Sequence, residues 1–238
     1  VVGADERGGF SHGGSLYALG LASCGMDNNH FEYISKVLLN GKMAQDEPLQ
    51  AGAALALGLS AIGSGSEKMW LFEGLREVLW SEQPIAGLCA GIAIGLLYTG
   101  QYANPDVQSI VKEIMASAIA CQHRNSQLGQ GLALALIHLN AQEVADPIIN
   151  YLRFSKIATP FTRWAACWLD AMAYCGTGNE RVIQRLLHYG TSDPDHDVKR
   201  TAIISLAFVL LNAPEKLVDI CEPLSTSYNE HIRFGVAL

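Results

Sequence analysis

The sequence has little charge, and little of that charge is basic. Only 16% of its 238 residues are charged, and 16 Lys and Arg stand against 23 Asp and Glu, which gives a net charge of −7. Nucleic-acid surfaces need clustered Lys and Arg, and the sequence has no long basic run. The composition therefore argues against nucleic-acid binding. Because half of the residues are hydrophobic, much of the chain must be buried or face a partner.

Hydrophobic runs long enough to span a membrane are also absent. The two longest strongly apolar runs, 51–62 and 87–99, have 12 and 13 residues. A spanning helix needs about 20 residues, so we expect buried core helices at both places and no membrane partner. The first ten residues, VVGADERGGF, have neither the charged start nor the apolar stretch of a secretory signal.

Cysteine pairs of the C-x-x-C type are missing as well. An unpaired cysteine in apolar helical sequence behaves as a small hydrophobic side chain. Most of the six cysteines stand in such sequence, at positions 24, 89, 121, 167, 175 and 221. We therefore expect reduced thiols and an intracellular protein.

What the sequence does contain is a repeat of about 37 residues. A segment rich in Gly, Ala and Leu recurs six times at intervals of 38, 37, 40, 36 and 36 residues, and a seventh copy starts at HIRFGVAL and is cut off at Leu238. Helices commonly end on a residue in the left-handed conformation, which Gly adopts freely and Asn tolerates. We expect such helix ends at the residues that close the six copies, which we call the marker residues: Gly25, Gly63, Gly100, Asn140, Gly176 and Asn212.

A second, amphipathic segment lies between successive copies. Each has apolar residues at helical spacing with charges on the other face. In the fifth of these segments, Val182, Leu186 and Tyr189 share a face, whereas Arg181 and Arg185 are expected to point away. Each repeat is thus predicted to be a helical hairpin. The second helices are expected at 30–41, 68–82, 106–120, 143–154, 180–190 and 215–225.

The first helix of each hairpin is hydrophobic on nearly all sides, as expected of a helix buried between neighbours. Its small residues recur at a spacing of four, as in Gly91 and Gly95, which lets helix backbones approach closely. Later copies have Ala135, Ala171 and Ala207 at the corresponding place, so equally close packing there is open. Sequence alone also leaves open whether the pair at 13–14 lies inside the first helix or marks its start.

These patterns predict an all-α fold over residues 1–238, a single solenoid of about six helical hairpins plus the truncated copy. A thin inner row and a bulkier outer row would curve it strongly, into part or most of a toroid of two concentric rows. The acidic and Pro-rich stretches QDEPLQ, SEQPI, ATPFT and SDPDHD precede the first helices, where caps and first-turn prolines belong.

Two loops have the residue types of ligand sites but not the spacing. Asp193, Asp195 and Asp197 alternate like the start of an EF-hand, but Val198 and Ile204 stand where Gly and Glu are needed. We expect a helix-capping turn there. The glycine-rich GSGSEK at 63–68 does not fit the phosphate-binding loop pattern and is expected to be a hairpin turn.

Candidate catalytic side chains are few. No H-x-x-x-H or H-E-x-x-H pair occurs, and His138 and His188, in helical sequence, are expected to be partly buried. Trp164 and Trp168 lie four apart on one helix face and are expected in the core. Asp170 lacks the second carboxylate that paired-acid chemistry needs, so we expect it to be a hydrogen-bonded structural residue. We predict no catalytic, cofactor-binding or metal residues and no cofactor, and the binding residues are unknown.

The repeat resembles the proteasome/cyclosome repeat. The resemblance rests on the period, on GGSLYALGL near the N-terminus, and on the stretches at 171–211 and 227–238. That repeat occurs in the two largest non-ATPase subunits of the 26S proteasome regulatory particle and in the largest anaphase-promoting complex subunit. The stretch at 171–211 is most similar to the larger base subunits of the proteasome. Family members fold their repeats into a toroid with flanking domains, so a fragment of a longer chain is expected.

The resemblance implies a non-enzymatic scaffold that helps to hold the ATPase ring, the lid and ubiquitin receptors or deubiquitinases together during degradation of ubiquitinated proteins. It also implies a cytoplasmic and nuclear location. One alternative is a HEAT- or armadillo-like adaptor of another complex, including the anaphase-promoting complex. Another is a glycosidase of the α/α-toroid type with Asp170 as its acid. Uncapped terminal repeats expose apolar faces, so we expect the isolated piece to self-associate.

Overall fold

The structure, a computed structural model, describes residues 8–24, 29–39, 46–65, 67–121, 123–154 and 159–238. These residues form α-helices, one short 3-10 helix and no strand, which confirms the predicted all-α fold. The chain divides into two compact units, residues 1–137 and 138–238. Within the described ranges, no helix combines the length and the apolar character that crossing a membrane requires.

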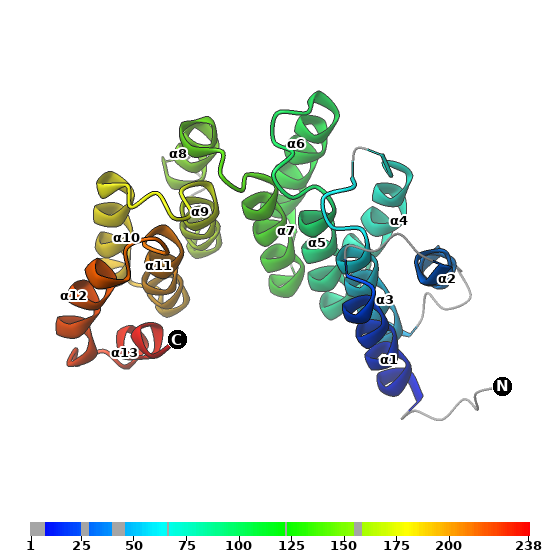
Figure 1. Cartoon of the computed structure of the whole chain (residues 1–238), viewed down its shortest axis with the longest axis horizontal. Coiled ribbons are helices and arrows are strands. Elements are labelled where there is room, and N and C mark those ends of the chain that lie inside the picture. The colour runs from blue at the N-terminus through cyan, green and yellow to red at the C-terminus, as the bar shows by residue number, and fades with distance from the viewer. Residues whose placement is uncertain (1–7, 25–28, 40–45, 66, 122, 155–158) are drawn as a thin grey trace. The chain divides into compact units, whose positions relative to one another are not determined.

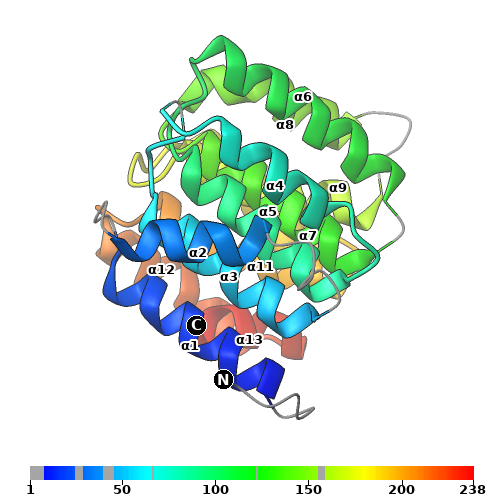
Figure 2. The same cartoon turned by 90° about the vertical axis from the view of Figure 1, so that its right-hand side faces the viewer.

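The first unit is a row of helices with a second layer on one side (Figures 1 and 2). Successive odd-numbered helices pack against one another, α1 on α3, α3 on α5 and α5 on α7, and α2, α4 and α6 pack on α3, α5 and α7. Each amphipathic helix therefore covers the first helix of the following repeat. The bounds are α1 (Gly8–Ala22), α2 (Asn29–Leu39), α3 (Glu47–Ser60), α4 (Trp70–Leu79), α5 (Pro84–Leu97), α6 (Pro105–Ala120) and α7 (Arg124–Ile137).

The second unit repeats this arrangement. Helix α11 packs between α9 and α13, and α8, α10 and α12 pack on α9, α11 and α13. The second helices occupy the segments that the amphipathic pattern predicts in both units. The bounds are η2 (Gln142–Ala145), α8 (Asp146–Phe154), α9 (Pro160–Ala173), α10 (Glu180–Ser192), α11 (His196–Val209), α12 (Pro214–Ser225) and α13 (Glu230–Ala237).

The marker residues close the first helices as predicted at four of six positions. Gly63, Gly100, Asn140 and Gly176 have φ values of 71°, 71°, 59° and 70°, in the left-handed region. The prediction is wrong for Asn212, whose φ is not positive. Its side chain serves another purpose, because Nδ2 donates a hydrogen bond of 3.0 Å to the carbonyl of Gly176. Gly25 lies outside the described residues.

Each left-handed marker also ties one repeat to the next. The backbone N–H of Gly63 donates to the carbonyl of Leu96 at 3.0 Å, and that of Gly176 donates to Phe208 at 2.8 Å. In every case the acceptor is the fourth residue before the next marker. The equivalent bonds join Gly100 to Leu136 at 3.2 Å and Asn140 to Met172 at 3.0 Å. The turn that ends one helix thereby satisfies a C-terminal carbonyl of the next.

Small residues bring the inner helices of the first unit into backbone contact, as predicted. A Cβ on Gly20 would stand 2.3 Å from the Cα of Ala56, and one on Gly58 would stand 2.6 Å from the Cα of Ala93. Gly13 and Gly14 both lie inside α1, which settles the question that the sequence leaves open. A Cβ on Gly13 would meet the carbonyl oxygen of Pro48, whereas Gly14 faces open space.

In the second unit, α9 and α11 approach each other without glycine at the corresponding positions. The hydroxyl of Ser205 donates a hydrogen bond of 3.1 Å across the contact to the carbonyl of Cys167, and both residues are buried. Ala171 is likewise fully buried. A small hydroxyl side chain therefore takes part in the close contact that glycine makes in the first unit.

The helix starts carry the predicted caps. The Asp46 side chain accepts a hydrogen bond from the N–H of Leu49 at the start of α3. Thr159 and Thr162 form a reciprocal capping box at the start of α9, and prolines stand in the first turns of α3, α5 and α9. These caps satisfy helix N–H groups that have no partner within the helix.

Candidate interaction surface

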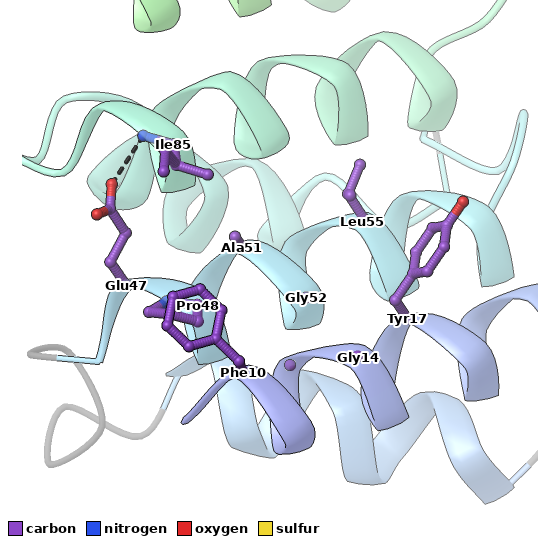
Figure 3. A pocket seen from close by; sticks show the side chains of 10 residues that line it. Phe10, Gly14, Tyr17, Glu47, Pro48, Ala51, Gly52, Leu55 and Ile85 are labelled. Atoms are coloured by element: carbon purple, nitrogen blue, oxygen red, sulfur yellow. Dashed lines mark hydrogen bonds between the residues drawn. The ribbon is translucent and has the colours of Figure 1, made fainter. Parts of the chain in front are cut away.

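An apolar groove of about 270 Å³ lies where α1, α3 and α5 meet in the first unit (Figure 3). Its rim is formed by Phe10 and Tyr17 of α1 and Ile85 of α5, which are 74%, 41% and 51% exposed. Pro48 and Leu55 of α3 line it as well. Large apolar side chains held at the surface in one patch are typical of a site that contacts another apolar surface.

The glycines of α1 and α3 shape this groove. Gly13 and Gly52 are in backbone contact, since a Cβ on Gly52 would stand 2.1 Å from the carbonyl oxygen of Gly13. Gly14, one residue on, has nothing within 4 Å of its Cβ position and leaves the groove open. Gly13 therefore permits the contact between α1 and α3, and Gly14 leaves a hollow beside that contact.

One charged side chain, Glu47, lies at the edge of the groove, and its carboxylate accepts hydrogen bonds from the backbone of α5. Its Oε1 accepts hydrogen bonds from the N–H groups of Ile85 at 2.7 Å and Ala86 at 3.4 Å (Figure 3). These N–H groups belong to the first turn of α5, where the helix dipole favours a negative charge. Glu47 thus caps the helix of the next repeat, and the interior of the groove stays apolar.

The apolar character continues along the inner row. The first helices α3, α5 and α7 carry charge only at Glu47 and Arg124, the first residues of α3 and α7. Aliphatic side chains recur at equivalent register positions, four and eight residues before the marker, and are half-buried. We call this set the inner face of the first unit: Leu55, Leu59, Ile92, Leu96, Leu132 and Leu136.

In the second unit, the side chain of Asp170 forms a buried ion pair with Arg185. Asp170 is fully buried in α9, and Arg185 of α10 donates to both of its carboxylate oxygens, with Nε at 2.9 Å from Oδ2. Burial raises the pKa of Asp170 from its ordinary 3.8 to about 6, against the opposing effect of the Arg185 guanidinium. The expected hydrogen bonding of Asp170 is confirmed. The expectation that Arg185 points away is wrong, because its long side chain reaches the buried carboxylate.

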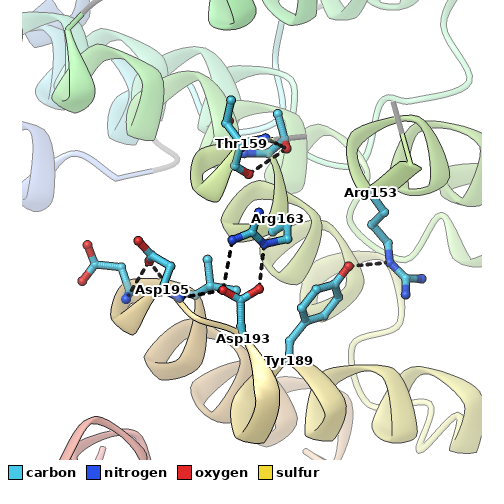
Figure 4. Close-up of polar contacts among 9 residues, drawn as sticks. Arg153, Thr159, Arg163, Tyr189, Asp193 and Asp195 are labelled. Atoms are coloured by element: carbon cyan, nitrogen blue, oxygen red, sulfur yellow. Dashed lines mark hydrogen bonds and ion pairs between the residues drawn. The ribbon is translucent and has the colours of Figure 1, made fainter. Parts of the chain in front are cut away.

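The aspartates of 193–197 form a capping turn, as predicted (Figure 4). The Asp195 side chain accepts from the N–H groups of Asp197 and Val198 at the start of α11. Asp193 is buried and receives two hydrogen bonds from the guanidinium of Arg163, at 2.6 and 3.1 Å. That hydrogen bonding raises the pKa of Arg163. The turn between α10 and α11 is thereby fixed to α9.

The two tryptophans of α9 lie among aromatic side chains, and the two histidines named above differ in burial. Trp164 and Trp168 are half-buried in a row of aromatic contacts, and the Trp168 ring lies 5.8 Å from that of Phe208 across the α9–α11 contact. His138 is buried as expected. The expectation is wrong for His188, which is exposed because it lies on the face of α10 opposite Val182 and Leu186.

Three tyrosine contacts were not predicted from the sequence. The hydroxyl of Tyr174 donates to Asp146 Oδ1 at 3.0 Å, which with burial raises its pKa, and Arg153 Nε donates to the hydroxyl of Tyr189 at 2.9 Å (Figure 4). Tyr98 stands two residues before its marker, as Tyr174 does, and its hydroxyl lies 3.4 Å from Met69 Sδ. For Tyr98 and Tyr174, the shared position two residues before a marker residue is the sequence signal that could have identified these contacts.

The part of the chain that the structure describes contains no cluster of side chains suited to binding a metal ion. Among those residues, no three His, Cys, Asp or Glu side chains are arranged to hold a metal ion. The six cysteines are unpaired; Cys89 and Cys167 are buried and Cys24 is exposed. Burial raises the pKa of the Cys89 thiol to about 11, so it is a packing group rather than a nucleophile.

No family model matches the chain. Curated relatives do match nearly all of it. The 26S proteasome non-ATPase regulatory subunit 1 homolog A of Arabidopsis thaliana is 37% identical over 230 residues, 96% of this chain and 22% of the relative. The 26S proteasome regulatory subunit rpn2 of Schizosaccharomyces pombe is 34% identical over 229 residues, 96% of the chain and 23% of the relative. The 26S proteasome non-ATPase regulatory subunit 1 of Drosophila melanogaster is 34% identical over 235 residues, which are 99% of this chain and 22% of the relative.

The chain therefore spans less than a quarter of the length of these relatives. The match runs through all of the helical hairpins rather than one motif, which agrees with a proteasome/cyclosome repeat region. By sequence, the chain is homologous over nearly its whole length to 26S proteasome non-ATPase regulatory subunit 1/Rpn2 proteins and corresponds to a proteasome/cyclosome repeat region of those proteins.

Proposed function

We propose that the chain is a scaffold segment of the proteasome regulatory particle and acts in ubiquitin-dependent protein degradation. The observation that carries this proposal is the identity of 34–37% to non-ATPase regulatory subunits of the 26S proteasome over at least 96% of the chain. Repeat arrays present long continuous surfaces to partners. Other proteasome subunits, among them the ATPase ring, the lid and ubiquitin receptors or deubiquitinases, are the proposed partners, in the cytoplasm and the nucleus.

The residue chemistry supports a role in binding rather than catalysis. Asp170, the acid of α9, is bound by Arg185 on both oxygens. The inner face of the first unit and the groove beside Phe10 and Tyr17 carry aliphatic and aromatic side chains. Such surfaces contribute to association through apolar burial, at about 25 cal/mol per Å². We therefore propose a non-enzymatic protein.

The proposal is tested by tagging the protein at its own gene and identifying what purifies with it. The expected result is recovery of named subunits of the 26S proteasome regulatory particle in stoichiometric amounts. A tagged unrelated solenoid protein of similar size serves as the control for nonspecific recovery. Purification of a stable, folded protein with none of these subunits would overturn the proposed function.

A further inference from the structure

The last two inner helices of the second unit meet through a pair of histidines. The ring centroids of His196 and His231 are 4.1 Å apart. His196 is the first residue of α11 and His231 the second residue of α13. Arg200, one turn further along α11, donates from Nε and Nη2 to Nδ1 of His231, at 3.1 and 2.8 Å.

This geometry fixes the protonation state of His231. A guanidinium has donors only and stays protonated, so Nδ1 of His231 must accept and cannot carry a proton. The ring is therefore neutral, with its proton on Nε2, which lies 3.7 Å from Oε1 of Glu230. A proton added at Nδ1 would remove the acceptor of both Arg200 bonds and place a second positive charge 2.8 Å from Nη2.

The other charged groups around His231 do not reverse this effect. From α11, Asp197 forms an ion pair of 3.5 Å with Arg200 and is 41% exposed, and from α13, Glu230 is 76% exposed. Arg233 donates to the carbonyls of Ser227 and Tyr228. Helix α12, which also packs on α13, carries Glu215, Lys216, Asp219 and Glu222, and none of these forms a hydrogen bond or ion pair with His231 within the described residues.

The net effect is a lowered pKa of His231. Partial burial, His196 and Arg200 lower it, and Glu230 and Asp197 oppose them. The positive ends of the helix dipoles act in the same direction, because both rings stand in first turns. A group with a lowered pKa in the docked state binds its proton more tightly when undocked, so docking weakens as the pH falls through and below about 6.5.

Helix α13 has two buried residues, Ile232 and Gly235, and Gly235 packs on Ile203 of α11. Phe234 is half-exposed, with the Arg200 guanidinium 5.5 Å from its ring. Arg200 therefore contacts both the histidine and the aromatic ring, and a charge on His231 disturbs the Arg200 contact.

We propose that His231, with Arg200 and His196, makes the contact between α11 and α13 sensitive to acid, so that protonation of His231 weakens the packing of α13 on α11. The device lies between two inner helices of successive repeats.

Two measurements on the full 238-residue chain test this proposal. The first is an NMR titration of the His231 ring, which is expected to show the Nε2–H tautomer at neutral pH and a pKa below 6.5. A pKa at or above 6.5, or the Nδ1–H tautomer, would overturn the proposal. This measurement needs no variant, so it decides even if a substitution prevents folding.

The second is hydrogen exchange of α13, corrected for the intrinsic effect of pH on exchange and compared with α5, which has no acidic, basic or histidine side chain. The opening equilibrium of α13 is expected to rise on going from pH 7.5 to 5, by up to tenfold for each unit by which docking lowers the pKa. His231→Asn, which keeps a neutral acceptor for Arg200, is expected to abolish the rise. His188→Asn, at an exposed histidine of α10, is expected to keep it. Equal responses of α13 and α5, or a rise that survives His231→Asn, would contradict the proposal.

Discussion

Gly20 of α1 lies so close to Ala56 of α3 that a Cβ on Gly20 would stand 2.3 Å from the Cα of Ala56. No real Cβ contact is that short, so the two helices touch backbone to backbone. The same register position, five residues before the marker, brings Gly58 against Ala93 and Gly95 against Ala133. The glycines that appear to spoil the first helices are the residues that allow the helices to stack.

Gly20→Ala is therefore expected to destabilise the first unit, because α1 and α3 must move apart. Overpacking of this kind costs about 1–3 kcal/mol in the free energy of unfolding. Gly14→Ala is the matched control: its Cβ meets nothing within 4 Å, and alanine in a helix interior is favoured by about 0.5–1 kcal/mol. Urea unfolding followed by helical circular dichroism measures both. Equal effects of the two substitutions would contradict the assigned contact.

Substitutions of Gly63, a marker residue in the left-handed conformation, are expected to act through the backbone conformation rather than through a close contact. The φ of Gly63 is +71°, and a Cβ there would meet no atom within 4 Å, so conformation alone sets the cost. Gly63→Ala is expected to lower the free energy of unfolding by about 1–2 kcal/mol. Gly63→Asn should cost less, because Asn tolerates this conformation, as Asn140 does at φ 59°. An alanine variant as stable as the asparagine variant would argue against the turn.

The buried pair of Asp170 and Arg185 is expected to show strong coupling. Arg185→Met leaves the fully buried carboxylate of Asp170 without its counter-charge, and breaking a buried pair costs about 3–5 kcal/mol. Replacing both residues by Leu and Met is expected to be close to neutral, since apolar groups of similar size avoid the cost of burying two charges. Arg181→Met, at an exposed arginine of the same helix, is the control. Additive losses in the double variant would rule out the pair.

The same carboxyl group predicts a dependence on pH. Burial raises the pKa of Asp170 from 3.8 to about 6, so the folded state holds the proton more tightly than the unfolded state does. Its contribution to the free energy of unfolding is present in full below about pH 4 and is lost as the pH rises through about 6. Asp170→Asn is expected to remove this fall. Asp219→Asn, at an exposed position of α12, should retain it; urea midpoints between pH 4 and 7 make the comparison.

Periodicity and turn chemistry carry most of the fold. The marker spacing predicts the helix ends because Gly63, Gly100 and Gly176 need a conformation that few other residues adopt. Asn212 shows the limit of that reasoning: an asparagine has a side chain that can bond elsewhere, and here it bonds to Gly176.

Features of the candidate surface depend on contacts between repeats, which a single sequence does not display. Arg185 looks like a solvent-facing residue of an amphipathic helix until Asp170 is found beneath it. Glu47 looks like an ordinary first-turn acid, yet it caps the helix that starts 37 residues later, at Pro84. The groove arises because Gly13 permits a contact and Gly14 leaves a space, and nothing in the letters distinguishes the two.

The central claim is that this array is a scaffold segment of the proteasome regulatory particle, and quantitative purification of the gene-tagged protein tests it most directly. The protein and its Asp219→Asn variant, substituted at an exposed position of α12, are expected to recover regulatory-particle subunits in equal amounts. Gly20→Ala, which disturbs the stacking of α1 on α3, is expected to recover less. A folded, unsubstituted protein that purifies without any subunit of the regulatory particle would contradict the account.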